Sequence, residues 1–246
     1  MISLRNITKS FEKQAVLCGV SLDVSEGENL VIIGRSGTGK SVTLKHILGL
    51  IHPDSGDVYV GGYHVNTQSE ESLAPMRRNI GMVFQNGALF DSMTVGDNVA
   101  FPLREDKKLS KSEIQDQVYH TLSLVGLANA ALKMPSEISG GMRKRVALAR
   151  ALIRKPKIMM YDEPTAGLDP ILSDSISRLI KNVADQFNMT VIVVTHDMAS
   201  AYLIADRIAM LHKGKIYKTA TPEEIRESND PIIYNFVRGI STQDDL

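Results

Sequence analysis

The sequence predicts an α/β fold in which a parallel β-sheet carries an antiparallel β edge and an inserted helical segment. Three observations predict this class. Short apolar runs of strand length end in Gly or polar residues, and helical patterns lie between the later runs, as in a parallel sheet that helices cover on both faces. The first runs differ, because they alternate apolar and polar residues and have no helix between them.

Four apolar runs are expected to form the buried strands of the parallel sheet, because each is too short to be a helix. They are residues 30–33, 80–84, 158–161 and 191–194. Helices are expected where apolar residues recur with the helical period. They are residues 41–50, 143–153 and 173–187. The alternating runs at residues 2–10, 16–24 and 57–61 predict the antiparallel edge.

The strand pattern disappears between residues 85 and 156, where a helical pattern dominates. Ser110 and Glu113 have the spacing of a capping box, in which each side chain bonds to the backbone N–H of the other at a helix start. This stretch therefore predicts a helical insertion. Thr221 and Glu224 repeat the spacing near the C-terminus and predict a further helix there.

Composition restricts the partners and the location of the chain. The 246 residues, 43% of them hydrophobic, are enough to bury the core of one large domain. Lys plus Arg and Asp plus Glu number 28 each, so no overall charge draws the chain to nucleic acid or to an anionic bilayer. The apolar runs are far shorter than the ~20 residues of a spanning helix, and the N-terminus lacks the apolar core of a signal peptide. We therefore expect a cytosolic chain that reaches a membrane through a partner and binds no nucleic acid.

Two further features are expected to be structural. Cys18 is the only cysteine, so neither an internal disulfide nor a thiolate metal cluster can form. Arg143, Lys144 and Arg145 form a short basic cluster, which is most simply a solvated helix face or a partner contact.

A phosphate-binding loop follows the first buried strand and opens a helix, which is the context that this motif requires. It consists of Gly34, Arg35, Ser36, Gly37, Thr38, Gly39, Lys40 and Ser41. The glycines let backbone N–H groups turn inward around phosphate oxygens, and the helix points its positive end at them. Lys40 is expected to place a charge beside the terminal phosphates, and Ser41 to ligate magnesium. The motif predicts a P-loop NTPase core.

Residues 157–163 form an apolar strand that ends in two adjacent carboxylates, Asp162 and Glu163. Beside a phosphate loop, their roles are expected to differ. Asp162 would hold the hydrated magnesium, whereas Glu163 would orient or deprotonate the water that attacks the terminal phosphate. Solvated carboxylates are common at strand ends, so this interpretation depends on the phosphate loop.

The order of motifs along the chain resembles that of ABC transporter nucleotide-binding subunits. The phosphate loop is followed by Gln85, by Ser139-Gly140-Gly141, by Asp162-Glu163 and by His196. The resemblance extends over residues 1–225 and implies a single ABC ATPase domain over residues 1–246 that binds ATP and Mg²⁺. The implied parts are a RecA-like core with the β edge at residues 1–86 and 156–220, a helical subdomain at 87–155 and a C-terminal helical tail at 221–246.

The segment Ser139, Gly140 and Gly141 leads into an apolar-periodic helix, so its hydroxyl and backbone N–H groups form an anion site at a helix N-terminus. The resemblance implies that two subunits dock head to tail and that each such segment closes over the partner's nucleotide. Asp169 would lie in the loop that touches the partner subunit. We therefore expect a dimer, with a homodimer as the simplest form, bound to integral membrane permease subunits.

The resemblance also implies roles for single residues. Gln85 corresponds to the residue that contacts magnesium and the attacking water and reports the nucleotide state to the membrane subunit. His196 corresponds to the switch histidine, which contacts the terminal phosphate. Phe11 holds the aromatic position that stacks on adenine, and Val16 and Thr43 complete the expected nucleotide contacts. The expected catalytic residues are Glu163, His196, Gln85 and Lys40, and the expected magnesium contacts are Ser41, Gln85 and Asp162.

Several segments indicate which transporter group the chain resembles. Met142 stands where Gln is usual in the family. With Met142, the segments that carry the likeness are residues 84–90, 95–104, 134–137, 229–231 and 236–240. They resemble the ATPases of phospholipid-trafficking Mla and Mce-type systems. This likeness implies phospholipid transport through a permease, lipid-binding accessory proteins, and a place on the cytoplasmic face of the inner membrane.

Three other readings share parts of the same motifs. The motor of an amino-acid or other small-solute importer would share every nucleotide-site residue. A soluble ABC ATPase of translation or DNA repair usually carries two motor halves or a long coiled-coil insertion, neither of which this sequence has. A subunit that binds ATP without hydrolysing it is disfavoured, because Lys40, Asp162, Glu163 and His196 are all intact.

Overall fold

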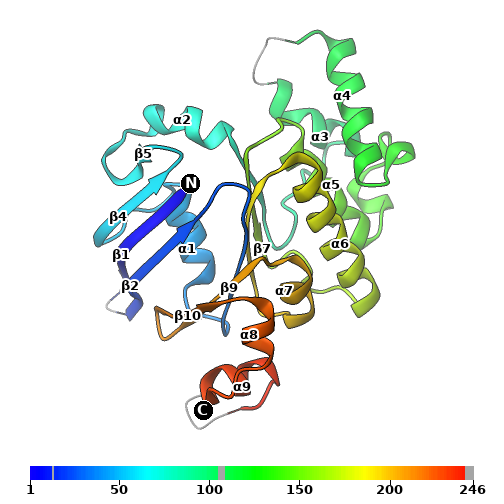
Figure 1. The fold of residues 1–246 in the computed structure, drawn as a ribbon. Coiled ribbons are helices and arrows are strands. Elements are labelled where there is room, and N and C mark those ends of the chain that lie inside the picture. Colours follow the sequence, from blue (N-terminus) through cyan, green and yellow to red (C-terminus); the bar gives the residue numbers. More distant parts are fainter. Residues whose placement is uncertain (13, 105–108, 242–246) are drawn as a thin grey trace. The chain divides into compact units, whose positions relative to one another are not determined.

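The computed structural model describes residues 1–12, 14–104 and 109–241, and the chain divides into two units (Figure 1). The first unit comprises Met1–Met76 and Thr190–Leu246, and the second comprises Arg77–Met189. The α/β fold class predicted from the sequence is confirmed, because both units combine strands with helices.

The antiparallel edge in the first unit is a four-stranded sheet with the order β2-β1-β4-β5. Its strands are β1 (Ile2–Phe11), β2 (Gln14–Val24), β4 (Ser55–Val60) and β5 (Tyr63–His64). Ile2, Leu4 and Ile7 of β1 are buried. Ile2 lies opposite Val24 of β2 on one side and Val60 of β4 on the other. The alternation of apolar and polar residues therefore sets one face of each strand against the core.

The second sheet of this unit is centred on β3 (Asn29–Ile33), which is buried at every position. It pairs in parallel with β8 (Thr190–Thr195) and β9 (Arg207–His212), and β10 (Lys215–Ala220) returns antiparallel to β9. A continuous apolar run suits such a strand, because both of its faces are covered. The Asp206 carboxylate accepts hydrogen bonds from the backbone N–H and the side-chain amide of Asn29, at 2.8 and 3.0 Å. These bonds fix the start of β3 beside β9.

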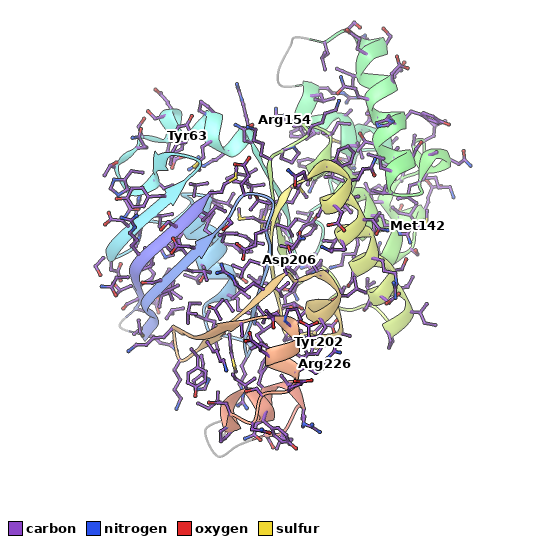
Figure 2. All side chains as sticks on the ribbon, in the orientation of Figure 1. Tyr63, Met142, Arg154, Tyr202, Asp206 and Arg226 are labelled. Atoms are coloured by element: carbon purple, nitrogen blue, oxygen red, sulfur yellow. The ribbon has the colours of Figure 1, made fainter. Side chains whose placement is uncertain are left out.

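The helices of the first unit are α1 (Lys40–Ile47), η1 (Val65–Thr67), α2 (Glu70–Arg78, which ends beyond the unit), α7 (Met198–Ile204), α8 (Pro222–Arg226) and α9 (Pro231–Val237). Among them, α7, α8 and α9 are capped by the side chains of Asp197, Thr221 and Asp230. The predicted capping box of Thr221 and Glu224 is confirmed at α8. Asp230 caps α9 and also accepts a hydrogen bond of 2.8 Å from the Tyr217 hydroxyl. Arg226 of α8 lies over the ring of Tyr202, 4.5 Å from its centre (Figure 2).

The second unit contains two parallel strands and a series of helices. The strands are β6 (Ile80–Val83) and β7 (Ile158–Asp162), and the helices are α3 (Val95–Arg104), α4 (Lys111–Leu124), η2 (Ala128–Ala130), η3 (Pro135–Glu137), α5 (Gly140–Leu152) and α6 (Pro170–Phe187). The described residues between β6 and β7 include no strand, as the sequence predicted. The capping box of Ser110 and Glu113 is confirmed at the start of α4.

Two helices of the second unit begin earlier than their apolar period predicts. Ser139 caps α5 and Asp169 caps α6, so both helices start at the next residue. A cap satisfies backbone N–H groups that have no partner within the helix, and it therefore fixes the first turn even where that turn is polar. In the described part of the chain, no helix is long and apolar enough to span a bilayer.

Candidate nucleotide site

The phosphate loop leaves the carboxyl end of β3, and two of its glycines are required by the backbone. A Cβ on Gly34 would lie 2.5 Å from the carbonyl oxygen of Leu211, closer than real atoms approach. Gly39 has φ of +104°, and a Cβ there would lie 2.6 Å from Cδ2 of Leu17. Only glycine lets the chain turn this tightly against β9 and β2. The loop shape is therefore built into the packing of the first unit.

Lys40 is buried and turns back into the loop. Its Nζ donates hydrogen bonds to the carbonyl oxygens of Gly34 and Arg35, at 2.8 and 3.1 Å. No side chain in the described residues caps the start of α1 at Gly39, so its first turn presents backbone N–H groups and the positive end of the helix. An ammonium and a helix N-terminus at one loop suit a phosphate group.

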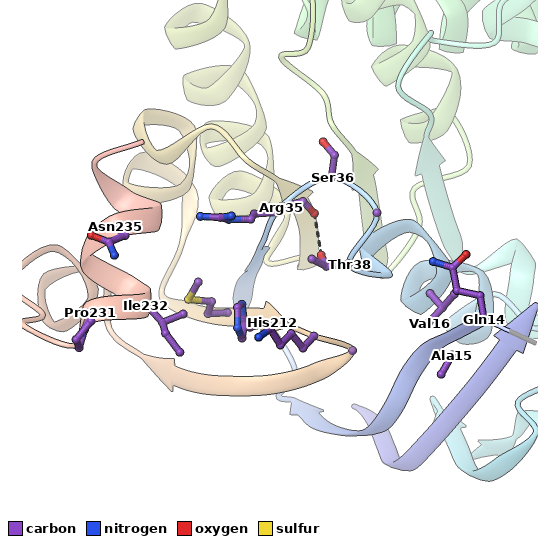
Figure 3. Close-up of a pocket in the computed structure, with 14 residues that line it drawn as sticks. Gln14, Ala15, Val16, Arg35, Ser36, Thr38, His212, Pro231, Ile232 and Asn235 are labelled. Carbon is purple, nitrogen blue, oxygen red and sulfur yellow. Dashed lines mark hydrogen bonds between the residues drawn. The ribbon is translucent and has the colours of Figure 1, made fainter. Parts of the chain in front are cut away.

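A pocket of about 820 Å³ adjoins the loop within the first unit (Figure 3). Its walls come from the loop, from the start of β2, from the turn between β9 and β10, and from α9. The lining residues include Arg35, Ser36, Thr38, Val16, His212 and Asn235. The volume lies within the usual range of ligand pockets. Val16, predicted to contact nucleotide, lies in this wall, whereas Phe11 is exposed at the end of β1 with Lys9 Nζ 5.6 Å from its ring centre.

Two other predicted residues of the first unit occupy different environments. Thr43 is buried, and its hydroxyl donates a 3.0 Å hydrogen bond to the Gly39 carbonyl, so it supports the first turn of α1. His196 is exposed and follows the end of β8. Because Thr195 lies opposite Ile33 in the parallel pair, His196 and Gly34 leave neighbouring strands at the same edge. This edge is where parallel α/β sheets hold their ligands.

The second unit repeats that arrangement with acidic and amide side chains. Val83 lies opposite Tyr161, so Gln85 and the Asp162-Glu163 pair leave β6 and β7 at the same edge. Gln85 is exposed, Asp162 is half-buried and Glu163 is buried. Glu163 also has φ of 48°, in the left-handed region. Such a backbone costs about 1–2 kcal/mol for a residue with a Cβ, and strained residues cluster at functional sites.

The N-termini of α5 and α6 hold the remaining predicted residues. Ser139 Oγ accepts a 3.3 Å hydrogen bond from the N–H of Met142, and the hydroxyl proton can still point outward. Asp169 accepts hydrogen bonds from the N–H groups of Ile171 and Leu172, both 3.0 Å, so its carboxylate serves α6. The nucleotide contacts predicted for Ser139 and Asp169 stay predictions.

The sequence predicted a solvated face or a partner contact for the basic residues at the start of α5, and two of the three are half-buried and bond within the chain. Arg143 is exposed, but Lys144 donates to the backbone carbonyl of Gln85. Arg145 donates to the Val125 carbonyl at 3.2 Å and to the Ser175 hydroxyl at 2.8 Å. A helix that packs on both sides leaves little of its circumference to solvent, and a sequence does not reveal which side chains then reach across.

Comparison with known proteins gives a consistent family. The chain matches the ABC transporter family model over residues 17–166. It is 42% identical over 238 residues to the probable ribonucleotide transport ATP-binding protein mkl of Mycobacterium leprae, which covers 97% of this chain and 69% of that protein. It is 41% identical over 256 residues to the protein TRIGALACTOSYLDIACYLGLYCEROL 3, chloroplastic, of Arabidopsis thaliana, with coverage of 97% and 74%.

A solved structure agrees with these relatives. A dimeric post-hydrolysis state of the ATP-binding cassette MJ0796 bound to ADP and Pi has a TM-score of 0.83 and 34% identity, and the match covers 90% of this chain and 99% of that one. The chain therefore belongs to the ABC transporter family, with the fold of its nucleotide-binding domains. It is an ATPase, and the family, fold and enzymatic activity predicted from the sequence are confirmed.

Sequence reasoning missed two features of this site. It did not predict that α9 forms a wall of the pocket beside the phosphate loop, although Asp230-Pro231 has the cap-and-proline pattern that begins a helix. It also did not predict that Lys144 reaches Gln85. That contact joins residues 59 positions apart and has no local pattern.

Proposed function

We propose that this chain is the ATP-hydrolysing motor of a transporter that moves phospholipid between membranes through a membrane-embedded permease. The transporter ATPase is the established class, and the lipid substrate is the proposal. One observation carries it: two of the segments whose sequences resemble phospholipid-trafficking ATPases, residues 84–90 and 95–104, line a single groove in the second unit. The name of the Arabidopsis relative also refers to a glycerolipid, whereas the mycobacterial relative is named for ribonucleotide transport.

The groove has a volume of about 460 Å³ and an aromatic rim. Phe84 and Phe90 come from the loop after β6, and Phe101 and Pro102 come from α3. The rings of Phe90 and Phe101 contact each other at a tilt, with 4.8 Å between ring centres, and Phe84 and Phe90 are both exposed. Exposed aromatic side chains around a concave surface are typical of a protein interface. We assign this groove to a segment of the permease, so that Gln85 lies next to the contact.

We assign the nucleotide chemistry to the residues that the sequence predicted for it. The loop N–H groups and Lys40 bind the phosphates, and Glu163 orients the attacking water, with His196 at the terminal phosphate. Mg²⁺ suits the oxygen donors of Ser41, Gln85 and Asp162, because it is a hard cation that prefers oxygen ligands. When bound, it neutralises charge on the phosphate oxygens. The chain's own contribution is to hold the phosphates and to direct one water.

A second copy of the chain completes each site. Gly140 and Gly141 open α5 beside Ser139. Among the described residues, a Cβ on Gly140 would come no closer than 4.0 Å to Cδ2 of Leu168, whereas one on Gly141 would contact Leu172 at 3.5 Å. Packing therefore leaves room at Gly140, which suits the close approach of another molecule. The dimeric state of the cassette bound to ADP and Pi supports a dimer. We place the assembly on the cytoplasmic face of the inner membrane, with lipid-binding accessory proteins.

The substrate is tested on the assembled complex. The chain is purified with its membrane subunits, and the organic extract is analysed by mass spectrometry. We expect phospholipid above the background of the detergent belt. A polar solute bound instead, with no excess lipid, would support the small-solute importer. Co-purifying ribosomes or DNA would support a soluble ABC ATPase.

The groove is tested with matched phenylalanines of the second unit. Phe90 and Phe187 are both 40% exposed, but only Phe90 lines the groove. Phe90→Ala is expected to reduce the stimulation of ATPase activity by the permease while ATP binding stays intact. Phe187→Ala is the control and should change neither. Loss of ATP binding in Phe90→Ala would instead assign this loop to the nucleotide pocket.

The shared site is tested with mixed dimers in a Glu163→Gln background. Ser139→Arg on one chain and Lys40→Ala on the other concentrate both defects at one composite site and leave the second intact. Both changes on the same chain damage both sites. Trapped ATP per dimer should therefore be higher for the first arrangement. Equal occupancy in the two arrangements would refute the head-to-tail dimer.

A further inference from the structure

The loop after β6 is held against one face of α5. Lys144 Nζ donates to the carbonyl of Gln85, and Arg150 donates to the carbonyls of Gly87 and Ala88, at 2.9 and 2.7 Å. Between these contacts, a Cβ on Gly87 would lie 3.4 Å from Cβ of Ala147. Positions 144, 147 and 150 recur every three residues and so share one side of the helix. Two cations and a small residue thus hold the backbone of this loop.

Lys144 lies in a narrow apolar slot between strands and helices of the second unit. Its neighbours there are Val83, Leu148, Tyr161, Pro164, Ile176 and Ile180. Burial lowers the pKa of the Lys144 ammonium, and the negative charge of Glu163 partly opposes this shift. Burial also raises the pKa of Tyr161, so its neutral phenol supplies no charge to the slot. The ammonium therefore donates to the Gln85 carbonyl, and the negative charge of Glu163 favours its charged form.

Stability of α5 does not explain a lysine at this position. Lys144 is close to the N-terminus of a helix that begins at Gly140, and the positive end of the helix disfavours a cation there. The Lys144 side chain is half-buried and lines an apolar slot, and partial burial of an ammonium is costly unless it finds partners. The partners that it has both belong to the hydrolytic side of the site. We therefore attribute the lysine at position 144 to its interaction with groups outside α5.

We propose that Lys144 is a positioning residue for ATP hydrolysis, which ties the helix begun by Ser139 to Gln85 and to Glu163. The inference rests on the roles assigned to these three residues under the proposed function. Because α5 is a continuous helix, movement of Ser139 onto a nucleotide carries Lys144 with it. The Gln85 backbone and the Glu163 carboxylate then move with α5, so closure at one nucleotide adjusts the hydrolytic groups of the same chain.

Three substitutions separate the two interactions of Lys144. Lys144→Arg keeps the charge and the donors, Lys144→Gln keeps a donor without the charge, and Lys144→Met removes both while filling the slot. Arg143→Met is the matched control, because it removes the same charge from the exposed preceding residue of the same helix. ATPase activity is measured on the chain purified with its membrane subunits, together with the melting temperature.

We expect kcat to fall roughly tenfold or more in Lys144→Met, the effect of losing one charge-assisted hydrogen bond. The KM for ATP should change less than about twofold, because the phosphate loop is untouched. Lys144→Gln should be intermediate, and Lys144→Arg and Arg143→Met should stay close to the parent. The melting temperature of Lys144→Met should hold or rise, because methionine suits an apolar slot. A residue that merely supported the fold would lower it.

The proposal would be overturned if Lys144→Met kept the kcat of the parent chain. It would also be overturned if the kcat of Arg143→Met fell as much as that of Lys144→Met. Parent kcat in Lys144→Gln would overturn the link to Glu163. If the melting temperature of Lys144→Met is lower than that of the parent, the inference is tested by comparing Lys144→Gln with Lys144→Arg. Equal kcat in these two variants would contradict it. Glu163→Gln is measured in parallel. Should it hydrolyse ATP at the parent rate, the proposed site is wrong; if it is inactive while Lys144→Met is normal, only the role of Lys144 fails.

Discussion

The residues predicted to serve the nucleotide are held in different ways in the two units of this chain. In the first unit, backbone packing fixes the conformation of the phosphate loop. Gly34 and Gly39 allow a turn that no other residue fits, and Lys40 bonds to carbonyls of the loop itself. In the second unit, side chains at strand ends and on α5 form the predicted site. Glu163 has a left-handed backbone, and Lys144 donates to the carbonyl of Gln85.

Because of this difference, we expect ATP binding and ATP hydrolysis to respond to different substitutions. A loop fixed by glycine packing is already shaped for phosphate in the absence of ligand. A carboxylate on a strained turn, and a loop held by two cations of a helix, depend on how the helices around them lie. Loss of Lys40 in the first unit should therefore weaken nucleotide binding, whereas loss of Glu163 in the second should slow hydrolysis and leave binding intact.

The largest expected effect comes from Glu163→Gln in the second unit. The amide keeps the shape of the side chain but cannot accept a proton, so turnover should fall at least ~100-fold, the lower end of what a general base contributes. ATP should still bind and hold two chains together. The measurements are ATPase rate and ATP retained after gel filtration. Hydrolysis by Glu163→Gln at the parent rate would contradict the assignment of hydrolysis to this residue of the second unit.

Lys40→Ala should have the next largest effect, and on binding. It removes the ammonium from the loop, and the affinity for ATP should fall roughly tenfold or more, as for one charge-assisted hydrogen bond. Lys45→Ala is the matched control, because Lys45 is an exposed lysine of the same helix. Calorimetric titration with ATP measures both. An unchanged dissociation constant for Lys40→Ala would show that the loop backbone alone binds the phosphates.

A glycine comparison sharpens the contrast between the units. Gly34→Ala forces Cβ against the Leu211 carbonyl and should lower the free energy of unfolding by about 1–3 kcal/mol. At Gly140 the nearest atom would be Cδ2 of Leu168 at 4.0 Å, so Gly140→Ala should leave stability unchanged or raise it by about 0.5–1 kcal/mol.

Gly140→Ala should nevertheless weaken ATP-driven dimerisation, because its added methyl group faces the approaching partner. Urea unfolding and analytical ultracentrifugation with ATP measure these two effects. Normal dimerisation of Gly140→Ala would mean that the partner does not approach this helix start.

The smallest effect is expected from the capping boxes, one in each unit. Ser110→Ala and Thr221→Ala each remove a side chain that accepts a hydrogen bond from the third residue of its helix. Each should lower the free energy of unfolding by about 1 kcal/mol. ATP affinity should not change in either variant, because neither cap belongs to the predicted site. A loss of ATP affinity in Thr221→Ala alone would connect the C-terminal tail to the nucleotide pocket.

The sequence by itself predicted the phosphate loop, the buried strands and the helix caps, and the structure contains each of these elements. The physical reason is that they are local. Eight consecutive residues define the loop, a run of apolar residues defines a buried strand, and a cap acts over three positions. The family could be predicted for the same reason, since the order of short motifs is visible without their arrangement in space.

Tertiary structure alone decided which distant groups meet. Lys144 seemed part of a solvated face until the packing of α5 brought it to a carbonyl 59 residues away. The left-handed backbone of Glu163, the approach of Leu211 to Gly34 and the wall that α9 gives to the pocket have the same origin. No periodicity encodes them, because they depend on how elements pack rather than on the residues next to them in the chain.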